Sequence, residues 1–189
     1  MALREILIYP DPRLKQKAKP VAEVDASVRK LCDDMAETMY EANGVGLAAP
    51  QLGVLQNVIA IDVEQRSAAE GEPPKKKGEG LFWLINPVIK SGEGEFTYTE
   101  GCLSIPDEYE EVTRFGRIVV EFIGRDGKQH RLEAASNLLS VCVQHEMDHL
   151  HGKLFVDHLS ALKRELIRRR MKKLKTQREA ERKGEATAL

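Results

Sequence analysis

LLSVCVQHEMDHLHG, residues 138–152, predicts a helix that is apolar on nearly every side. Ser136 or Asn137 can cap its start, and Gly152 stands where a helix ends. The apolar residues surround the helix axis: Leu138, Leu139, Val141, Val143, Met147 and Leu150. A helix without a polar face is buried, so we expect an α+β fold in which antiparallel β-sheets surround this helix.

The same helix carries the motif His145-Glu146-x-x-His149. At 100° per residue the two histidines lie about 40° apart, so both imidazoles can reach one metal ion. Glu146 lies beside that face, where its carboxylate can accept a proton from a metal-bound water. His151 lies about 120° from the ligand face, and we exclude it as a ligand.

A catalytic metal site takes three protein ligands and keeps a fourth position open. Peptidases with this motif take the third ligand from a Glu, His or Asp after the helix, and their extended form, His-x-x-Gly-x-x-His, does not match residues 149–158. Upstream, EGCLSIP at residues 100–106 offers Cys102, which we select as the third ligand. A small buried hydrophobe is the alternative for Cys102, and it is the preferred interpretation of Cys32 and Cys142.

Apolar periodicity predicts a second helix that starts near Ser27, with Gly44 beyond its end at the cap position. Its apolar residues recur at helical spacing: Val28, Leu31, Met35 and Met39. The segment at residues 66–80 is polar, rich in Gly and Pro and without periodicity, so it predicts a surface loop.

Two β-branched and aromatic runs, QNVIAIDV at residues 56–63 and LFWLINPVIK at residues 81–90, have the composition of strands. Residues 116–134 alternate between apolar and polar on both sides of Asp126-Gly127. This dipeptide is a strong turn signal, so the segment predicts a hairpin of two antiparallel strands.

The composition indicates one compact catalytic unit, because 42% of the 189 residues are apolar. No apolar stretch reaches the length of a membrane span, and the amino terminus lacks the order of residues in a secretory signal. Three cysteines at irregular spacing indicate reduced thiols. We therefore expect a cytoplasmic monomer with no membrane partner.

Charge divides the chain into an acidic body and a basic tail. From Ser160 onward there are eleven Lys or Arg and four Glu, a net charge of +7, which leaves −8 for the rest of a chain whose net charge is −1. We expect residues 1–160 to form the catalytic domain and residues 161–189 a basic helical tail. An apolar seam is predicted along the tail: Leu162, Leu166 and Met171. Such a tail could meet a polyanion such as RNA, and a solvated helix face is the alternative.

The chain resembles the peptide deformylase family. Three motifs carry the resemblance: GVGLAAPQ at residues 44–51, EGCLS at residues 100–104 and QHEMDH at residues 144–149. The resemblance extends over residues 1–160 and weakly into the tail. It implies a metal-dependent hydrolase that removes the formyl group from N-formylmethionine of nascent polypeptides and releases formate.

The resemblance also implies the roles of the central residues. The ligands of one divalent metal ion, most often Fe(II) with Zn, Ni or Co as substitutes, are Cys102, His145 and His149. A metal-bound hydroxide attacks the formyl carbon, and Glu146 acts as general base and then as general acid. The side-chain amide of Gln51 and the backbone N–H of Leu103 stabilise the oxyanion.

Further roles follow from the resemblance. Glu100 pairs with Arg114 and braces the segment that holds Cys102; a loose surface pair is the alternative. In relatives with a basic C-terminal helix, that helix contacts the ribosome, and we hypothesise the same contact for this tail. The substrate's methionine lies against positions that could instead be ordinary core: Gly44, Val45, Gly46, Tyr98, Leu138, Val141 and Cys142.

Two other functions stay open from the residues alone. A zinc peptidase would cleave internal peptide bonds and would take a carboxylate or His in place of Cys102. A non-enzymatic module that binds nucleic acid or the ribosome would need a structural metal with four ligands, and no fourth Cys or His at ligand spacing is evident.

Overall fold

The computed structural model describes residues 2–64, 76 and 78–187. Most of the loop predicted at residues 66–80 therefore lies outside the described residues. The elements, in chain order, are η1 (Pro12–Lys15), α1 (Ala26–Glu41), β1 (Gly46–Ala48), η2 (Ala49–Leu52), β2 (Val58–Ile61), β3 (Phe82–Cys102), β4 (Ile105–Ile123), β5 (Gln129–Ala135), α2 (Leu138–Leu150), η3 (Phe155–His158) and α3 (Ala161–Thr187).

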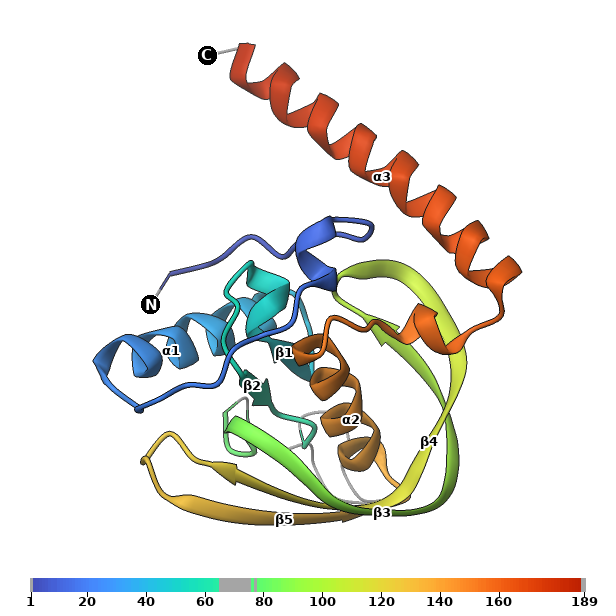
Figure 1. The fold of residues 1–189 in the computed structure, drawn as a ribbon. Helices are drawn as coiled ribbons and strands as arrows, with labels where there is room; N and C mark the ends of the chain where they lie inside the picture. The colour runs from blue at the N-terminus through green and yellow to red at the C-terminus, as the bar shows by residue number, and fades with distance from the viewer. Residues whose placement is uncertain (1, 65–75, 77, 188–189) are drawn as a thin grey trace.

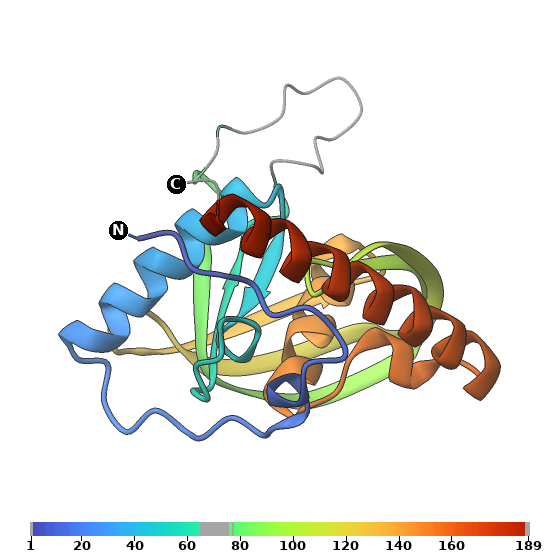
Figure 2. The same ribbon diagram turned by 90° about the horizontal axis from the view of Figure 1, so that it is seen from above.

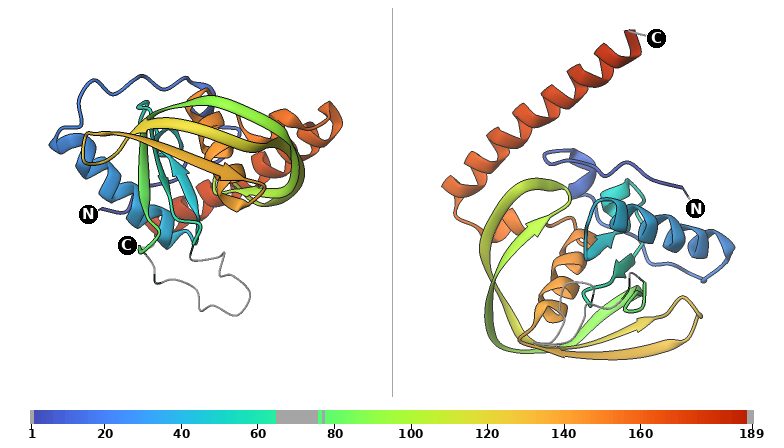
Figure 3. Two further views of the ribbon diagram at one scale, coloured as in Figure 1. Left: turned by 90° about the horizontal axis from the view of Figure 1, so that it is seen from below. Right: turned by 180° about the vertical axis from the view of Figure 1, so that it is seen from behind.

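Five strands form one antiparallel sheet in the order β1-β2-β3-β4-β5. The long strands β3 and β4 curve around α2, while α1 packs on the opposite face of β1 and β2 (Figures 1 and 3). The predicted α+β fold with a buried central helix and a C-terminal helix is confirmed. The strands belong to a single sheet.

The apolar run of β2 shows why α2 and α1 lie on opposite faces of the sheet. Ile59 and Ile61 pack in the cluster around α2, whereas Val58 and Ala60 pack in the cluster around α1. Because side chains alternate along a strand, a run that is apolar at every position is buried on both faces. The strand predicted in this segment is confirmed.

Local signals hold α2 in place. The Asn137 side chain accepts a hydrogen bond from the Ser140 N–H at 2.9 Å and so caps the start of the helix. After the helix, Gly152 adopts φ +71°, and a side chain there would collide with the backbone carbonyl of Lys15. Both predicted ends of this helix are confirmed.

The end of α1 differs from the prediction, since Asn43 and not Gly44 takes the left-handed conformation (φ +55°). The Gly44 N–H then donates to the Met39 carbonyl at 2.8 Å and closes the last turn. Asn tolerates this conformation better than most residues, so it serves here in place of glycine. Glycine is required at position 44 for a steric reason instead, because a Cβ there would lie 2.7 Å from Leu103 Cδ1.

The strands predicted at residues 81–90 and from residue 116 are shorter than the observed β3 and β4. β3 continues to Cys102, and β4 begins at Ile105, well before the predicted start at residue 116. The hairpin with a turn at Asp126-Gly127 is confirmed by the pairing of β4 with β5. The added part of β3 and β4 is rich in charged residues, and its backbone groups are satisfied by long pairing between the two strands rather than by an apolar pattern.

The packing face of α3 is also different from the prediction. Ile167 and Met171 are buried against the N-terminal segment, which runs beneath the helix in Figure 2. Leu162 and Leu166 are 72% and 47% exposed, so their place in the predicted seam was wrong. None of the helices in the described ranges is long and apolar enough to cross a membrane.

Candidate metal centre

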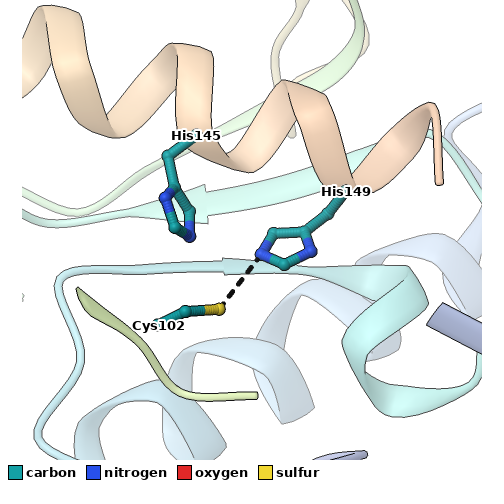
Figure 4. A group of neighbouring side chains, drawn as sticks. All are labelled: Cys102, His145 and His149. Atoms are coloured by element: carbon teal, nitrogen blue, oxygen red, sulfur yellow. Dashed lines mark hydrogen bonds between the residues drawn. The ribbon is translucent and has the colours of Figure 1, made fainter. Parts of the chain in front are cut away.

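Cys102, His145 and His149 come together inside the curved sheet, and both rings point toward the Cys102 sulfur (Figure 4). Their ligand atoms all lie within 4.8 Å of one another, and Cys102 Sγ is 3.4 Å from His149 Nε2. Cys102 is the last residue of β3, and the two histidines lie one turn apart on α2. Within the described ranges, no second group of His, Cys, Asp and Glu is arranged to hold a metal ion.

These three residues fit a divalent metal ion. A tetrahedral ion with bonds of about 2.3 Å to sulfur and about 2.0 Å to nitrogen holds the two ligand atoms about 3.5 Å apart. The observed 3.4 Å between Cys102 and His149 is close to that value. Burial lowers the pKa of His149 well below its usual range, which favours the neutral imidazole that binds metals.

The ligand set discriminates between the alternatives left open above. The third member is the thiol of Cys102, whereas a zinc peptidase would have a carboxylate or His in its place. The group has three members among the residues that the structure describes, so it lacks the fourth ligand of a structural metal site.

Glu100 and Arg114 lie directly behind His145. Arg114 Nη2 donates to Glu100 Oε2 at 2.9 Å, and its Nε donates to the other carboxylate oxygen. His145 Nδ1 lies 2.7 Å from Glu100 Oε2, which turns Nε2 toward the cluster. Burial raises the pKa of Glu100, but the hydrogen bonds from His145 and Arg114 outweigh it and hold that pKa below its usual range.

Asp148 and His158 extend this network. From the sequence, Asp148 could accept a hydrogen bond behind the ligands or could face solvent or cap the backbone, and His158 was expected in a surface or structural role. Asp148 Oδ2 accepts from Arg114 Nη1 at 2.9 Å and lies 2.7 Å from His158 Nε2. Burial raises the pKa of Asp148, but hydrogen bonds from His158 and Arg114 outweigh it and lower that pKa to about 2. The sequence placed Asp148 beside the ligands, but no local signal connected it with His158.

The carboxylate of Glu146 is buried, and burial raises its pKa to about 7. No donor among the described residues reaches its Oε2 atom. Gly46 on β1 makes room for this side chain, since a Cβ at Gly46 would lie 2.5 Å from Glu146 Oε1 and 2.7 Å from Cys142 Sγ. Gly46 therefore leaves room for a buried carboxylate beside the metal ligands.

Gln51 is held at the edge of the cluster. Its Oε1 accepts from the Ala48 N–H at 2.8 Å, and its Nε2 donates to Ser104 Oγ at 3.1 Å and lies 3.6 Å from Cys102 Sγ. Leu103 follows Cys102 in the turn between β3 and β4. Ser104 lies in the EGCLS motif, yet the motif alone did not show that its hydroxyl orients the Gln51 amide.

A cleft of about 760 Å³ opens beside the cluster. All the positions expected to contact the methionine line it: Gly44, Val45, Gly46, Tyr98, Leu138, Val141 and Cys142. Sequence reasoning missed Ile6, Ile8 and Tyr109, which also line the cleft. His151 lies outside the group, with Nδ1 2.8 Å from the Met147 carbonyl.

A buried His-Glu-x-x-His helix, a cysteine as the third member of the group and an enclosing antiparallel sheet together define a metal-dependent hydrolase. Residues 3–165 match the polypeptide deformylase family model. The chain belongs to this family, which confirms the resemblance seen in the three motifs.

Individual relatives agree over most of the chain. The chain is 51% identical to a peptide deformylase of Alkalilimnicola ehrlichii, with 92% of both chains covered. It is 46% identical to one of Nitrosococcus oceani, with 92% of this chain and 96% of that protein covered. The crystal structure of a peptide deformylase from Legionella pneumophila superposes with a TM-score of 0.83 at 43% identity, covering 94% of this chain and 98% of that one.

Proposed function

We propose that this protein removes the formyl group from N-formylmethionine at the start of nascent polypeptides in the cytoplasm and releases formate. One observation carries the proposal: the Glu146 carboxylate is buried beside the Cys102, His145 and His149 group, with an oxygen that no described donor reaches. Membership of the polypeptide deformylase family supports it, as does the similarity to peptide deformylases of Alkalilimnicola ehrlichii and Nitrosococcus oceani.

Cys102, His145 and His149 would hold the metal ion, and we propose Fe(II) as the native ion, with Zn, Ni or Co as substitutes. A bound divalent ion supplies Lewis acidity, which polarises the formyl carbonyl and lowers the pKa of water. A thiolate suits Fe(II) as well as Zn, but it leaves the site sensitive to oxidation.

Glu146 moves the proton in this reaction. Its carboxylate accepts a proton from the attacking water, and the resulting carboxylic acid donates that proton to the departing amine. A pKa of about 7 suits both steps, because proton transfer is most efficient when the pKa of the group is close to the working pH. Gly46 keeps the carboxylate close to the reacting atoms because it has no side chain.

Gln51 and Leu103 would stabilise the negative charge that develops on the formyl oxygen. The Ala48 N–H and the Ser104 hydroxyl fix the orientation of the Gln51 amide before substrate binds. A donor that is already oriented does not need to reorganise in the transition state, and loss of one such donor raises the barrier by about 3 kcal/mol.

The methionine side chain would occupy the inner part of the cleft. Val45, Leu138 and Val141 supply an apolar lining, and Gly44 and Gly46 let the backbone approach the substrate closely. Tyr98 and Cys142 complete the proposed pocket. An unbranched side chain such as methionine adapts to a lining of this kind.

We also propose that residues 1–160 are the catalytic domain and that the basic tail, residues 161–189, contacts the ribosome. Arg168, Arg169 and Lys172 are exposed on α3.

Truncation after Ser160 would also remove Ile167 and Met171 from their buried cluster, so charge reversal is the sharper test of ribosome contact. Replacing the three basic residues by Glu should weaken cosedimentation with ribosomes and leave tripeptide hydrolysis unchanged; unchanged cosedimentation would make the tail a solvated helix.

The role of Glu146 is tested by Glu146→Ala in protein loaded with Fe(II) under nitrogen. Formate release from an N-formylmethionyl tripeptide should fall by about 10²- to 10⁴-fold while metal content is retained, because Glu146 is not among the ligands. Glu133→Ala, which removes an exposed carboxylate from β5, is the matched control and should behave as wild type. A Glu146→Ala protein as active as wild type would show that another group moves the proton.

A further inference from the structure

A continuous series of hydrogen-bonded polar side chains connects His145 with the protein surface. It runs from His145 through Glu100 and Arg114 to Asp148, and it ends at His158 on η3. The five side chains come from four elements, α2, β3, β4 and η3, so the series fixes these elements relative to one another behind the metal ligands.

Arg114 is the central member, and its two carboxylate partners lie on different sides of the guanidinium. Nε and Nη2 donate to Glu100, whereas Nη1 donates to Asp148 at 2.9 Å. A guanidinium is planar and rigid, so two carboxylates together fix both its position and its plane. With Glu100 alone, the pair could rotate as a unit and carry the His145 ring with it.

His158 closes the series at its outer end. Its Nε2 lies 2.7 Å from the same Asp148 oxygen that accepts from Arg114. The Asp148 side chain is 18% exposed and the His158 side chain 35%, so His158 is the more exposed of the two. With one donor on each side, the Asp148 carboxylate has a single preferred orientation.

We propose that Asp148 and His158 are positioning residues of the metal centre. They hold Arg114 against Glu100, and Glu100 in turn orients the His145 ring toward the ligand position. The inference rests on the proposed function only in requiring that Cys102, His145 and His149 bind a metal ion. Hydrogen-bond partners behind metal ligands typically contribute 10- to 100-fold to metal affinity or activity.

The alternative is an ordinary surface pair, and the chain contains one for comparison. His130 Nε2 lies 3.0 Å from Asp126 Oδ1 at the turn between β4 and β5, and both side chains are more than 40% exposed. This pair has the same chemistry and connects to no metal ligand, so His130→Leu is the matched control for His158→Leu.

The test measures the dissociation constant for Co(II) by chelator competition, together with the visible absorption of the bound ion. Asp148→Asn should weaken binding about 10-fold and His158→Leu by a smaller factor. His158→Gln should restore affinity, because its amide N–H can donate to Asp148. His130→Leu should match wild type.

His158→Leu separates positioning from simple electrostatics. The substitution removes no negative charge, so an electrostatic effect alone would leave cation binding unchanged or tighter. Weaker binding that His158→Gln rescues supports positioning. Wild-type Co(II) affinity and absorption in both Asp148→Asn and His158→Leu would overturn the proposal, as would an equal loss in His130→Leu.

The variants distinguish a folding defect, a failure of the positioning role and a failure of the proposed function. If Asp148→Asn fails to fold, the three histidine variants decide the question. If the Co(II) affinities follow the expected order but formylated peptides are not hydrolysed, the positioning roles stand and the proposed function fails.

Discussion

Two arginine–carboxylate pairs with nearly the same geometry lie in different surroundings in this protein. Arg114 and Glu100 form a two-point pair in which the arginine side chain is 4% exposed. Arg170 on α3 and Glu108 on β4 also form a two-point pair, at 2.5 and 2.6 Å, but this arginine is 57% exposed.

The difference shows how burial changes the consequence of one interaction. Removing a partner from a buried pair leaves an uncompensated charge in a medium that solvates it poorly. Removing a partner from an exposed pair leaves a charge that water solvates well. The pair at Arg114 therefore determines the geometry of the metal centre, whereas the pair at Arg170 adjusts how α3 rests on the body.

The largest expected effect comes from Arg114→Met. Glu100 and Asp148 would lose their shared cation, so we expect a loss of about 3 to 5 kcal/mol in the free energy of unfolding. Urea denaturation at neutral pH measures this loss. Arg114→Lys keeps the charge but cannot reach both carboxylates, and it should fall between wild type and Arg114→Met. A loss below about 1 kcal/mol for Arg114→Met would put this pair in the same category as a surface pair.

The next-largest effect is expected on the rate of formate release rather than on the free energy of unfolding. Gly46→Ala would place a methyl group 2.5 Å from Glu146 Oε1, so the carboxylate has to move. We expect formate release to fall by about 10²-fold, the effect of a catalytic group displaced by roughly 1 Å. Gly116→Ala is the matched control, because its nearest neighbour would lie at 3.4 Å. Equal rates in both variants would show that Gly46 has no role in seating Glu146.

Asp34 on α1 is intermediate between the buried pair at Arg114 and the exposed pair at Arg170. Its carboxylate is buried, whereas its two partners are partly exposed. Hydrogen bonds from Lys30 and Arg4 lower the pKa of Asp34 to about 2. Because the pKa is lower in the folded state, the stabilisation is complete above the unfolded pKa of about 4 and disappears as the pH falls toward 2.

Asp34→Asn should therefore lower the free energy of unfolding by about 1 kcal/mol at pH 5, a value reduced for solvent around Arg4 and Lys30. The difference between wild type and variant should shrink toward zero at pH 2. Chemical denaturation across this range measures it. A difference that grows as the pH falls would contradict the direction of the pKa shift.

The smallest effect is expected for Arg170→Met. With the arginine mostly in water, the loss should be about 0.5 kcal/mol, and a double-mutant cycle with Glu108→Gln should give a coupling energy of similar size. Metal affinity should not change. A coupling energy above about 2 kcal/mol would remove the distinction between the two pairs.

The sequence was most informative for α2, because the same segment forms the central buried helix and holds two of the three metal ligands. The apolar surround of α2, its Asn137 cap and its end at Gly152 specify a buried helix, and the fixed angle between His145 and His149 specifies a common ligand face. The Gly-containing, strand-like segment EGCLSIP led to the selection of Cys102 from among three cysteines, and the structure places it in the group.

The sequence was least informative where long-range packing decides the outcome. The first half of β4 has no apolar run, because its backbone is stabilised by pairing with β3 rather than by burial. The contact face of α3 depends on where the N-terminal segment lies, so Leu162 and Leu166 were placed wrongly and Ile167 was missed. His158 reaches Asp148 only because η3 turns back toward α2, and no local pattern encodes that turn.

The most direct test of the proposed function is a product analysis. Fe(II)-loaded protein, prepared without oxygen, is incubated with an N-formylmethionyl tripeptide, and the products are identified by mass spectrometry beside the Glu146→Ala control. We predict formate and an intact tripeptide with a free amino terminus, and about 10²- to 10⁴-fold less of both products in the control over the same time. A cleaved internal peptide bond with the formyl group still in place, or no reaction from folded and metal-loaded protein, would contradict the assignment.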